Sequence, residues 1–405
     1  MKILKNKTIT DVNGIKASGI SGGLKKSGKK DFAVIYSEGN PVSSAVFTNN
    51  KVKAAPILLS MEHIKNPITK AIIVNSGNAN ACTGQIGMEN AHIMAQTAAD
   101  ELGVKKEEII VQSTGIIGVQ MDMEKIIPAI KKGCSKISTD GGNDAATAML
   151  TTDTFEKKLT VSFEVGGKEI TLAGIAKGSG MIHPDMGTML SSLVTDISIS
   201  KEMLDLAFKD CVSSSYNMIS VDGDTSTNDT AVIIANGLAG NSKIESVDDD
   251  FKKFKEVLIY INTELAKLIA KDGEGATKLI EVEVTNAVNL ESARKCAKSV
   301  IRSSLTKCAF FGEDPNWGRI LCAVGYSNAE FDPNKIDISF FSEGERIQIA
   351  KDGMGVDFDV EKAKEILLNK EVKVEIDLKD GEHSAIAWGC DLSYDYVRIN
   401  GEYTT

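Results

Sequence analysis

Lys177–Asp196 reads KGSGMIHPDMGTMLSSLVTD, and this segment says most about the fold and the chemistry. Within it, Gly187 stands directly before Thr188, and a strand-like run follows. Glycine tolerates strained backbone, and a strained peptide bond beside a hydroxyl can be attacked by that hydroxyl and then hydrolysed. Cleavage would leave Thr188 with a free α-amine of pKa about 8, so one residue would supply both nucleophile and base. The segment therefore predicts an enzyme that cuts itself before Thr188.

Plainer interpretations of this segment stay open from the residues alone. A Gly-Thr pair often introduces an ordinary strand, and the KGSG run at 177–180 has some likeness to a phosphate loop. That run lacks the G-x-x-x-x-G-K-[ST] spacing, which makes the phosphate-loop interpretation weak. His183 could serve as a base five residues before Thr188, but a free α-amine makes it unnecessary.

The composition favours an enzyme over a binding scaffold. The 405 residues are 42% hydrophobic but only 5% aromatic, with 35 glycines, which suits an α/β or α+β enzyme of two or three domains. A net charge of −10 argues against general affinity for nucleic acid or anionic membranes. Seven cysteines and four histidines are scattered, so we expect reduced thiols in the cytoplasm and no metal site. No signal peptide or membrane span is expected.

Strand-like apolar runs alternate with helical spacing, which predicts a mixed α and β fold. The clearest hairpin signal is Gly166-Gly167, between strand-like runs at 158–165 and 168–175. Further strands are predicted at 70–74, 108–112, 335–341, 371–378 and 385–392. Helices are predicted at 88–102, 123–132, 201–215, 249–271, 290–302 and 360–368. The order of the strands is not readable from this pattern.

Ordered motifs along nearly the whole chain carry a family resemblance. They are Gly14–Lys25, Asn75–Gly84, Ser113–Gly118, Thr151–Phe155, Lys177–Asp196, Ser220–Thr230, Asp272–Thr277, Gly312–Arg319 and the C-terminal 400–405. With these motifs the chain resembles the ornithine acetyltransferase family, the glutamate N-acetyltransferases of arginine biosynthesis. The resemblance implies an α+β fold: a mixed layered sandwich of helices and sheets with a self-processed N-terminal-nucleophile architecture. The family usually has alanine before the nucleophile, whereas this chain has Gly187, which leaves the cleavage rate open.

The resemblance also implies roles for individual residues. Thr188 is the nucleophile, Gly187-Thr188 is the cleavage site, and Thr114 with Gly115 forms the oxyanion hole. Lys177 is the expected partner of a substrate carboxylate, and Glu274 the expected partner of an ammonium group. The full set of implied substrate contacts is Thr151, Lys177, Thr188, Glu274, Asn400 and Thr405. Without the resemblance, Thr114-Gly115 would be an ordinary strand-ending turn and the other side chains ordinary surface residues. Trp317 is expected to have a packing role.

The implied reaction moves an acetyl group from N2-acetylornithine to glutamate through an acetyl-threonine, with acetyl-CoA as a further donor and no cofactor. The family further implies a heterotetramer of two α fragments (1–187) and two β fragments (188–405). We place a domain division near residue 280, giving 1–280 and 281–405. Two alternatives stay open: a self-processed aminopeptidase or amidohydrolase, which would use water as acceptor, and a non-catalytic relative.

Overall fold

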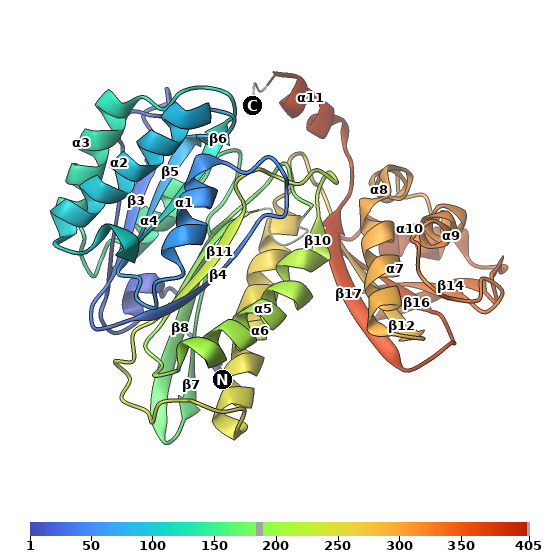
Figure 1. The fold of residues 1–405 in the computed structure, drawn as a ribbon. Helices are drawn as coiled ribbons and strands as arrows, with labels where there is room; N and C mark the ends of the chain where they lie inside the picture. The colour runs from blue at the N-terminus through green and yellow to red at the C-terminus, as the bar shows by residue number, and fades with distance from the viewer. Residues whose placement is uncertain (184–188, 403–405) are drawn as a thin grey trace.

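The computed structural model describes residues 1–183 and 189–402, and its strands form three sheets (Figure 1). A four-stranded sheet has the order β2 (Ile15–Ile20), β3 (Phe32–Ser37), β5 (Ala71–Asn78), β6 (Ile109–Ile116). A six-stranded sheet has the order β1 (Lys2–Ile3), β7 (Lys157–Val165), β8 (Lys168–Lys177), β9 (Leu190–Thr195), β11 (Thr230–Ala235), β4 (Val42–Phe47). These two sheets make up the N-terminal body.

The third sheet lies in the C-terminal lobe and has seven strands. Their order is β10 (Ile219–Ser220), β17 (His383–Cys390), β12 (Leu279–Ala287), β16 (Glu371–Asp377), β13 (Asp337–Ser342), β14 (Glu345–Lys351), β15 (Met354–Gly355). Only β10 comes from before residue 279, so we retain the division near residue 280 as a proposal. One hydrophobic cluster nevertheless runs from the N-terminal body into this sheet, so the two parts share a core.

The N-terminal body is a sandwich of four layers. The four-stranded and six-stranded sheets face each other across one buried cluster, which includes Val74, Ile175 and Val232. Helices α2 (Gly84–Leu102) and α3 (Met123–Ser135) cover the outer face of the four-stranded sheet. Helices α5 (Lys201–Ser214) and α6 (Asp249–Lys271) cover the outer face of the six-stranded sheet. The predicted α+β layered sandwich is therefore confirmed.

The remaining helices complete the layers. Helices α1 (Ala55–His63) and α4 (Gly142–Met149) pack on the four-stranded sheet, and α7 (Leu290–Arg302) packs on β12 and β17. Helices α8 (Ser304–Phe311), α9 (Trp317–Gly325) and α10 (Val360–Leu368) belong to the C-terminal lobe. Helix α11 (Tyr394–Glu402) returns from this lobe toward the N-terminal body (Figure 1). No helix within the described ranges has both the length and the apolar character needed to cross a bilayer.

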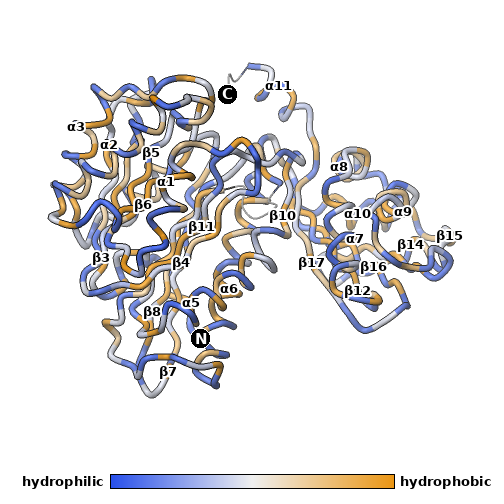
Figure 2. Tube along the Cα trace, in the orientation of Figure 1, coloured by the Kyte–Doolittle hydropathy of each residue, from blue (hydrophilic) through white to orange (hydrophobic). Residues whose placement is uncertain are grey.

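Local sequence explains much of this framework. The β7–β8 hairpin turns at Gly166 and Gly167, whose positive φ values of 54° and 72° suit the tight turn that pairs Val165 with Lys168. Apolar and polar residues are interspersed along α6, as Figure 2 shows, and the apolar residues on one side of the helix are buried in the core. Trp317 packs against the hydrophobic cluster that the N-terminal body and the seven-stranded sheet share, in agreement with the predicted packing role.

The structure also differs from the sequence predictions. Helix α2 begins at Gly84, earlier than the predicted residue 88, and β17 lies two residues before the predicted 385–392. Strands β2–β4 and helix α4 were not predicted. Residues of β2 are buried on both faces, so its sequence lacks the alternation that marks a half-exposed strand. Helix α4 is short, rich in small residues and has no side-chain cap, so few local signals mark it.

Candidate active site

A polar cavity of about 260 Å³ lies at the ends of several strands of the N-terminal body. The end of β6, the end of β8 and the start of β9 contribute to its wall, together with the loop before β11. Gly187 and Thr188 lie outside the described residues. Ile182 on one side of that gap and Met189 on the other both line the cavity and are buried.

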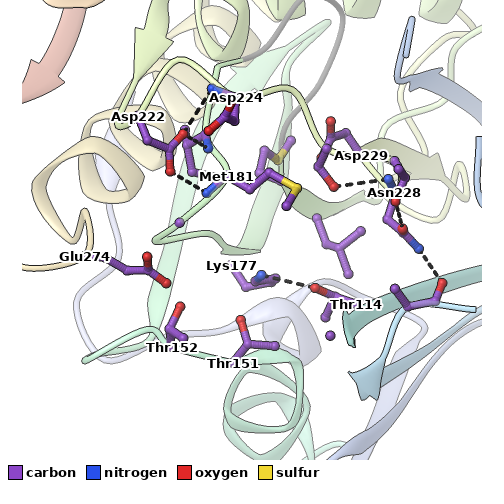
Figure 3. Close-up of a pocket in the computed structure, with 18 of the residues that line it drawn as sticks. Thr114, Thr151, Thr152, Lys177, Met181, Asp222, Asp224, Asn228, Asp229 and Glu274 are labelled. Atoms are coloured by element: carbon purple, nitrogen blue, oxygen red, sulfur yellow. Dashed lines mark hydrogen bonds between the residues drawn. The ribbon is translucent and has the colours of Figure 1, made fainter. Parts of the chain in front are cut away.

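Six residues predicted for the site line this one cavity, although they are far apart in sequence. They are Thr114, Gly115, Thr151, Lys177, Glu274 and Asn400. Figure 3 shows four of them, Thr114, Thr151, Lys177 and Glu274, gathered around the same space. Thr405 is outside the described residues. The structure thus brings the described members of the predicted set together, and their individual roles stay predictions.

The Thr114-Gly115 pair ends strand β6 in a geometry that requires glycine. Gly115 has a φ of 131°, and a Cβ at this position would lie 2.3 Å from the carbonyl carbon of Gly77 on β5. The Thr114 hydroxyl accepts a hydrogen bond of 3.2 Å from Lys177 Nζ (Figure 3). The close approach of the two strands fixes where this hydroxyl and the adjacent peptide lie.

Asn228 ties the loop before β11 to the same strand ends. Its Nδ2 donates to the carbonyl oxygens of Ala79, at 2.6 Å, and Ser113, at 2.9 Å. Both acceptors are close to the ends of the parallel pair β5 and β6. Since Asn228 is buried, these charge-neutral bonds are shielded from water and position the cavity wall.

Lys177 is a buried lysine at the end of β8. Burial lowers its pKa, while the nearby carboxylates of Asp153, Asp229 and Glu274 oppose that effect. Asp153 lies behind it and accepts a hydrogen bond of 2.7 Å from the Gly178 amide. Burial would raise the pKa of Asp153, but the positive charges of Lys177 and Lys157 outweigh burial and lower it to about 2.

A second buried lysine, Lys157, holds the loops behind the cavity together. Its Nζ lies 2.7 Å from Asp153 Oδ1 and 2.5 Å from Asp272 Oδ2. Asp272 also accepts a bond of 3.0 Å from the amide of Thr154. The ion pair between Lys157 and Asp272 and the bond from Thr154 therefore join the Thr151–Phe155 turn to the loop after α6, where Glu274 is located.

Glu274 is fixed from two directions. Its amide donates to the Ser179 carbonyl at 3.0 Å, and the Ser179 hydroxyl donates to the Asp272 carbonyl at 2.6 Å, so two glycine-rich loops interlock. Asn400 on α11 donates from Nδ2 to Glu274 Oε2 at 2.8 Å. Helix α11 thereby connects the C-terminal end of the described chain to the cavity.

Asp222 holds the backbone that leads toward Thr188. Its carboxylate accepts bonds from the amides of Met181, at 2.6 Å, and Ile182, at 2.8 Å (Figure 3). Met181 has a φ of 55°, an uncommon conformation for a residue other than glycine. Burial raises the pKa of Asp222, and burial next to this carboxylate raises the pKa of Tyr396. The two hydrogen bonds from consecutive amides to the Asp222 carboxylate stabilise the strained backbone conformation at Met181.

His183 does not line this cavity. Its Nδ1 lies 3.0 Å from Ser220 Oγ, and its side chain lines a separate cavity beside α7. Burial, helped by the positive charges of Lys298 and Arg302, lowers its pKa to about 3, so it is neutral near pH 7. This placement agrees with leaving His183 out of the catalytic set.

The charges of the cavity suit a small molecule with both charge types. Among the described residues that line it, Lys177 is the cation, and the carboxylates are Asp222, Asp224, Asp229 and Glu274. An amino acid with an additional ammonium group would match one cation surrounded by several anions. The layered fold and this polar cavity at strand ends define an enzyme that acts on a small charged substrate.

Comparisons with known proteins agree with this class. The ArgJ family model matches residues 16–405. The arginine biosynthesis bifunctional protein ArgJ of Caldanaerobacter subterraneus is 54% identical over 405 residues, covering 100% of both chains. The arginine biosynthesis bifunctional protein ArgJ 1 of Clostridium acetobutylicum is 52% identical over 403 residues, covering 100% of this chain and 99% of the relative.

A solved structure also matches. The crystal structure of the arginine biosynthesis bifunctional protein ArgJ of Bacillus halodurans gives a TM-score of 0.50 at 43% identity. The match covers 52% of this chain and 97% of that chain. This chain belongs to the ArgJ family. The family resemblance drawn from the sequence motifs is confirmed.

Several lining residues had no predicted role. Asp222, Asp224, Asn228 and Asp229 all fall in the Ser220–Thr230 motif, which carried only the resemblance. The many short polar side chains in this segment between two strands were the sequence signal that could have indicated a site there. Tyr396 also lines the cavity, and its sequence surroundings give no such signal.

Proposed function

We propose that this chain transfers an acetyl group from N2-acetylornithine to glutamate, giving ornithine and N-acetylglutamate in arginine biosynthesis. Its nucleophile is Thr188, freed when the chain cuts itself after Gly187. The observation that carries the proposal is the convergence of six predicted site residues on one cavity, whose wall includes Ile182 before the 184–188 segment and Met189 after it.

Each half-reaction has a place for its charges. The Thr188 hydroxyl attacks the acetyl carbonyl while its own α-amine takes the proton. The resulting oxyanion is stabilised by the Thr114 hydroxyl and the Gly115 peptide, a type of donor whose loss costs about 10²–10³ in rate. Collapse breaks the amide C–N bond, returns the proton to the leaving amine and leaves an acetyl ester on Thr188. The amine of glutamate then attacks that ester and regenerates the hydroxyl.

The cavity charges support binding of both amino acids. Lys177 offers a cation to the carboxylate that both substrates share, and burial makes that attraction stronger than it would be in water. Glu274 offers a carboxylate to the second ammonium group of ornithine. Its hydrogen bond from Asn400 holds it in place without neutralising it.

The proposal extends to the donors and the assembly. Acetyl-CoA serves as a second acetyl donor, in line with the bifunctional names of the relatives, and the transfer needs no resident cofactor or metal because Thr188 supplies its own base. The cleaved chains form a heterotetramer of fragments 1–187 and 188–405 in the cytoplasm. The solved relative's chain is matched along 97% of its length yet spans only 52% of this chain, a size that fits one such fragment.

The test is an assay of purified protein with N2-acetylornithine, with and without glutamate, in which ornithine, N-acetylglutamate and acetate are quantified. Equal amounts of ornithine and N-acetylglutamate, formed in multiple turnovers only when glutamate is present, are expected. The variant Thr188→Ala should form neither product. Release of acetate and ornithine at a rate indifferent to glutamate would instead identify a hydrolase, and the absence of all turnover would identify a non-catalytic relative.

A further inference from the structure

A second cavity, of about 780 Å³, lies along helix α7 and is strongly basic. We call it the basic cavity. Its cations all come from α7: Arg294, Lys295, Lys298 and Arg302. The only carboxylate among the described residues that line it is Glu291, which is paired with Lys295 at 2.6 Å. Such a concentration of positive charge, in a chain of net charge −10, is not explained by the acetyl-transfer cavity.

The basic cavity borders the acetyl-transfer cavity. His183 lines the basic cavity and follows Ile182, which lines the other one. Arg302 packs against Gly223, where a Cβ would lie 3.3 Å from Arg302 Nε. The neighbours of Gly223, Asp222 and Asp224, line the acetyl-transfer cavity. The two cavities therefore share the segments around 182–183 and 222–224 as a wall.

The basic cavity has the dimensions and surface for an extended anion. Its lining runs from Leu290 to Arg302, the full 13 residues of α7, or about 20 Å. Tyr326, 55% exposed, and Ser327 also line the cavity. An exposed aromatic ring beside cations is the combination that stacks a nucleobase while the cations bind phosphate groups.

We propose that the basic cavity binds the phosphate-bearing nucleotide end of acetyl-CoA, so that the thioester end extends past the shared wall into the acetyl-transfer cavity. The assignment to acetyl-CoA rests on the proposed function. The underlying chemistry, several phosphate groups with an aromatic base, is shared with free nucleotides, so the experiment separates the two sources. Arg294 and Arg302 contribute fixed positive charge with planar donors that match phosphate oxygens.

The experiment measures binding of adenosine 3′,5′-bisphosphate by calorimetry, with adenosine 5′-diphosphate as a second ligand. The variant Arg294→Gln/Arg302→Gln should raise the Kd for the bisphosphate by about 10- to 100-fold. The charge-preserving variant Arg294→Lys/Arg302→Lys should lose much less. Arg346→Gln, on strand β14 away from both cavities, is the matched control and should bind like the wild type.

Steady-state kinetics on the same proteins separate this proposal from the function proposed above. The glutamine variant should raise the KM for acetyl-CoA by about tenfold or more while kcat/KM for N2-acetylornithine stays within about twofold. Loss of nucleotide binding with unchanged acetyl-CoA kinetics would retain the anion site and overturn the assignment to acetyl-CoA. No bisphosphate binding by the wild type, or equal binding by the glutamine variant, would overturn the site while leaving transfer from N2-acetylornithine intact.

Discussion

Two buried lysines on neighbouring strands have opposite surroundings. Lys157 begins β7 and contacts two carboxylates, Asp153 at 2.7 Å and Asp272 at 2.5 Å. Lys177 ends β8, and its Nζ donates to the neutral hydroxyl of Thr114 at 3.2 Å. Among the described residues it makes no ion pair, and it faces the cavity. Only the first lysine has its charge neutralised by direct contact.

In the proposed function, this difference separates a structural charge, Lys157, from a substrate-binding charge, Lys177. Burying an ion costs several kcal/mol, which contacts with opposite charges must offset. The neutralised Lys157 links the Thr151–Phe155 turn to the loop that carries Glu274. Lys177 has no such contact among the described residues, and in the proposed function a substrate carboxylate would complete its surroundings. On this account, one buried lysine holds the loops of the site together and the other is left to bind the ligand.

The largest effect is expected from removing the structural lysine. Lys157→Met would leave two buried carboxylates without their cation, so the free energy of unfolding should fall by about 3–5 kcal/mol. Urea denaturation of fully processed protein measures it. Lys158→Met, whose ion pair with Glu156 is partly exposed, is the matched control and should change stability by under about 1 kcal/mol. Similar values for both variants would show that Lys157 is no more important for stability than a partly exposed lysine, and would contradict its structural role.

The next largest effect concerns binding at the cavity. Lys177→Met should lower kcat/KM for N2-acetylornithine by about 100-fold, because a hydrogen bond between charged groups is lost. Its free energy of unfolding should change far less than in Lys157→Met, since Asp153 keeps its contact with Lys157. A loss of stability matching that of Lys157→Met, with normal activity in the remaining folded protein, would make Lys177 structural too.

A smaller effect is expected on the stability at acid pH, which measures directly how the two lysines change the pKa of Asp153. The pKa of this carboxyl is about 2 in the folded protein against 3.8 for an unperturbed one. Because the folded pKa is lowered, its contribution of about 2 kcal/mol is present above pH 3.8 and is lost as the pH falls toward 2. In Lys177→Met the folded pKa of Asp153 should lie closer to 3.8, so the loss should be smaller and should be complete at a higher pH, as unfolding free energies between pH 5 and 2 would show. Superimposable pH profiles would contradict the assigned cause.

The smallest effect is expected in the segment leading to the cleavage site. In Asp222→Asn one side-chain oxygen remains to accept a bond, so one of the amides of Met181 and Ile182 loses its partner. Self-cleavage should slow by about tenfold. Gel analysis of freshly synthesised protein at successive times measures the rate. Asp224→Asn is the control, because Asp224 is exposed and lies in the same loop. Equal cleavage rates in both variants would deny Asp222 a positioning role.

Prediction from sequence succeeded where local signals mark the ends of elements. The predicted bounds of α6, α7 and α10 match the structure, and each helix has a side-chain cap, from Asp248, Asn289 and Asp359. The buried strands β2–β4 and the uncapped α4 lack such marks. The sequence motifs also predicted six of the residues that line the cavity. They did not predict the role of Asn228, which donates a hydrogen bond to a carbonyl 149 residues away, a contact that no local pattern encodes. The pairing of Lys157 with Asp272 across 115 residues is hidden for the same reason.

The most direct test is an intact-mass spectrum of active protein after incubation with N2-acetylornithine and no glutamate. Two polypeptides, residues 1–187 and 188–405, are expected, the second heavier by one acetyl group located on Thr188. Added glutamate should return that fragment to its unmodified mass. Full activity from an unbroken 405-residue chain, or turnover in which fragment 188–405 never carries an acetyl group, would contradict the mechanism.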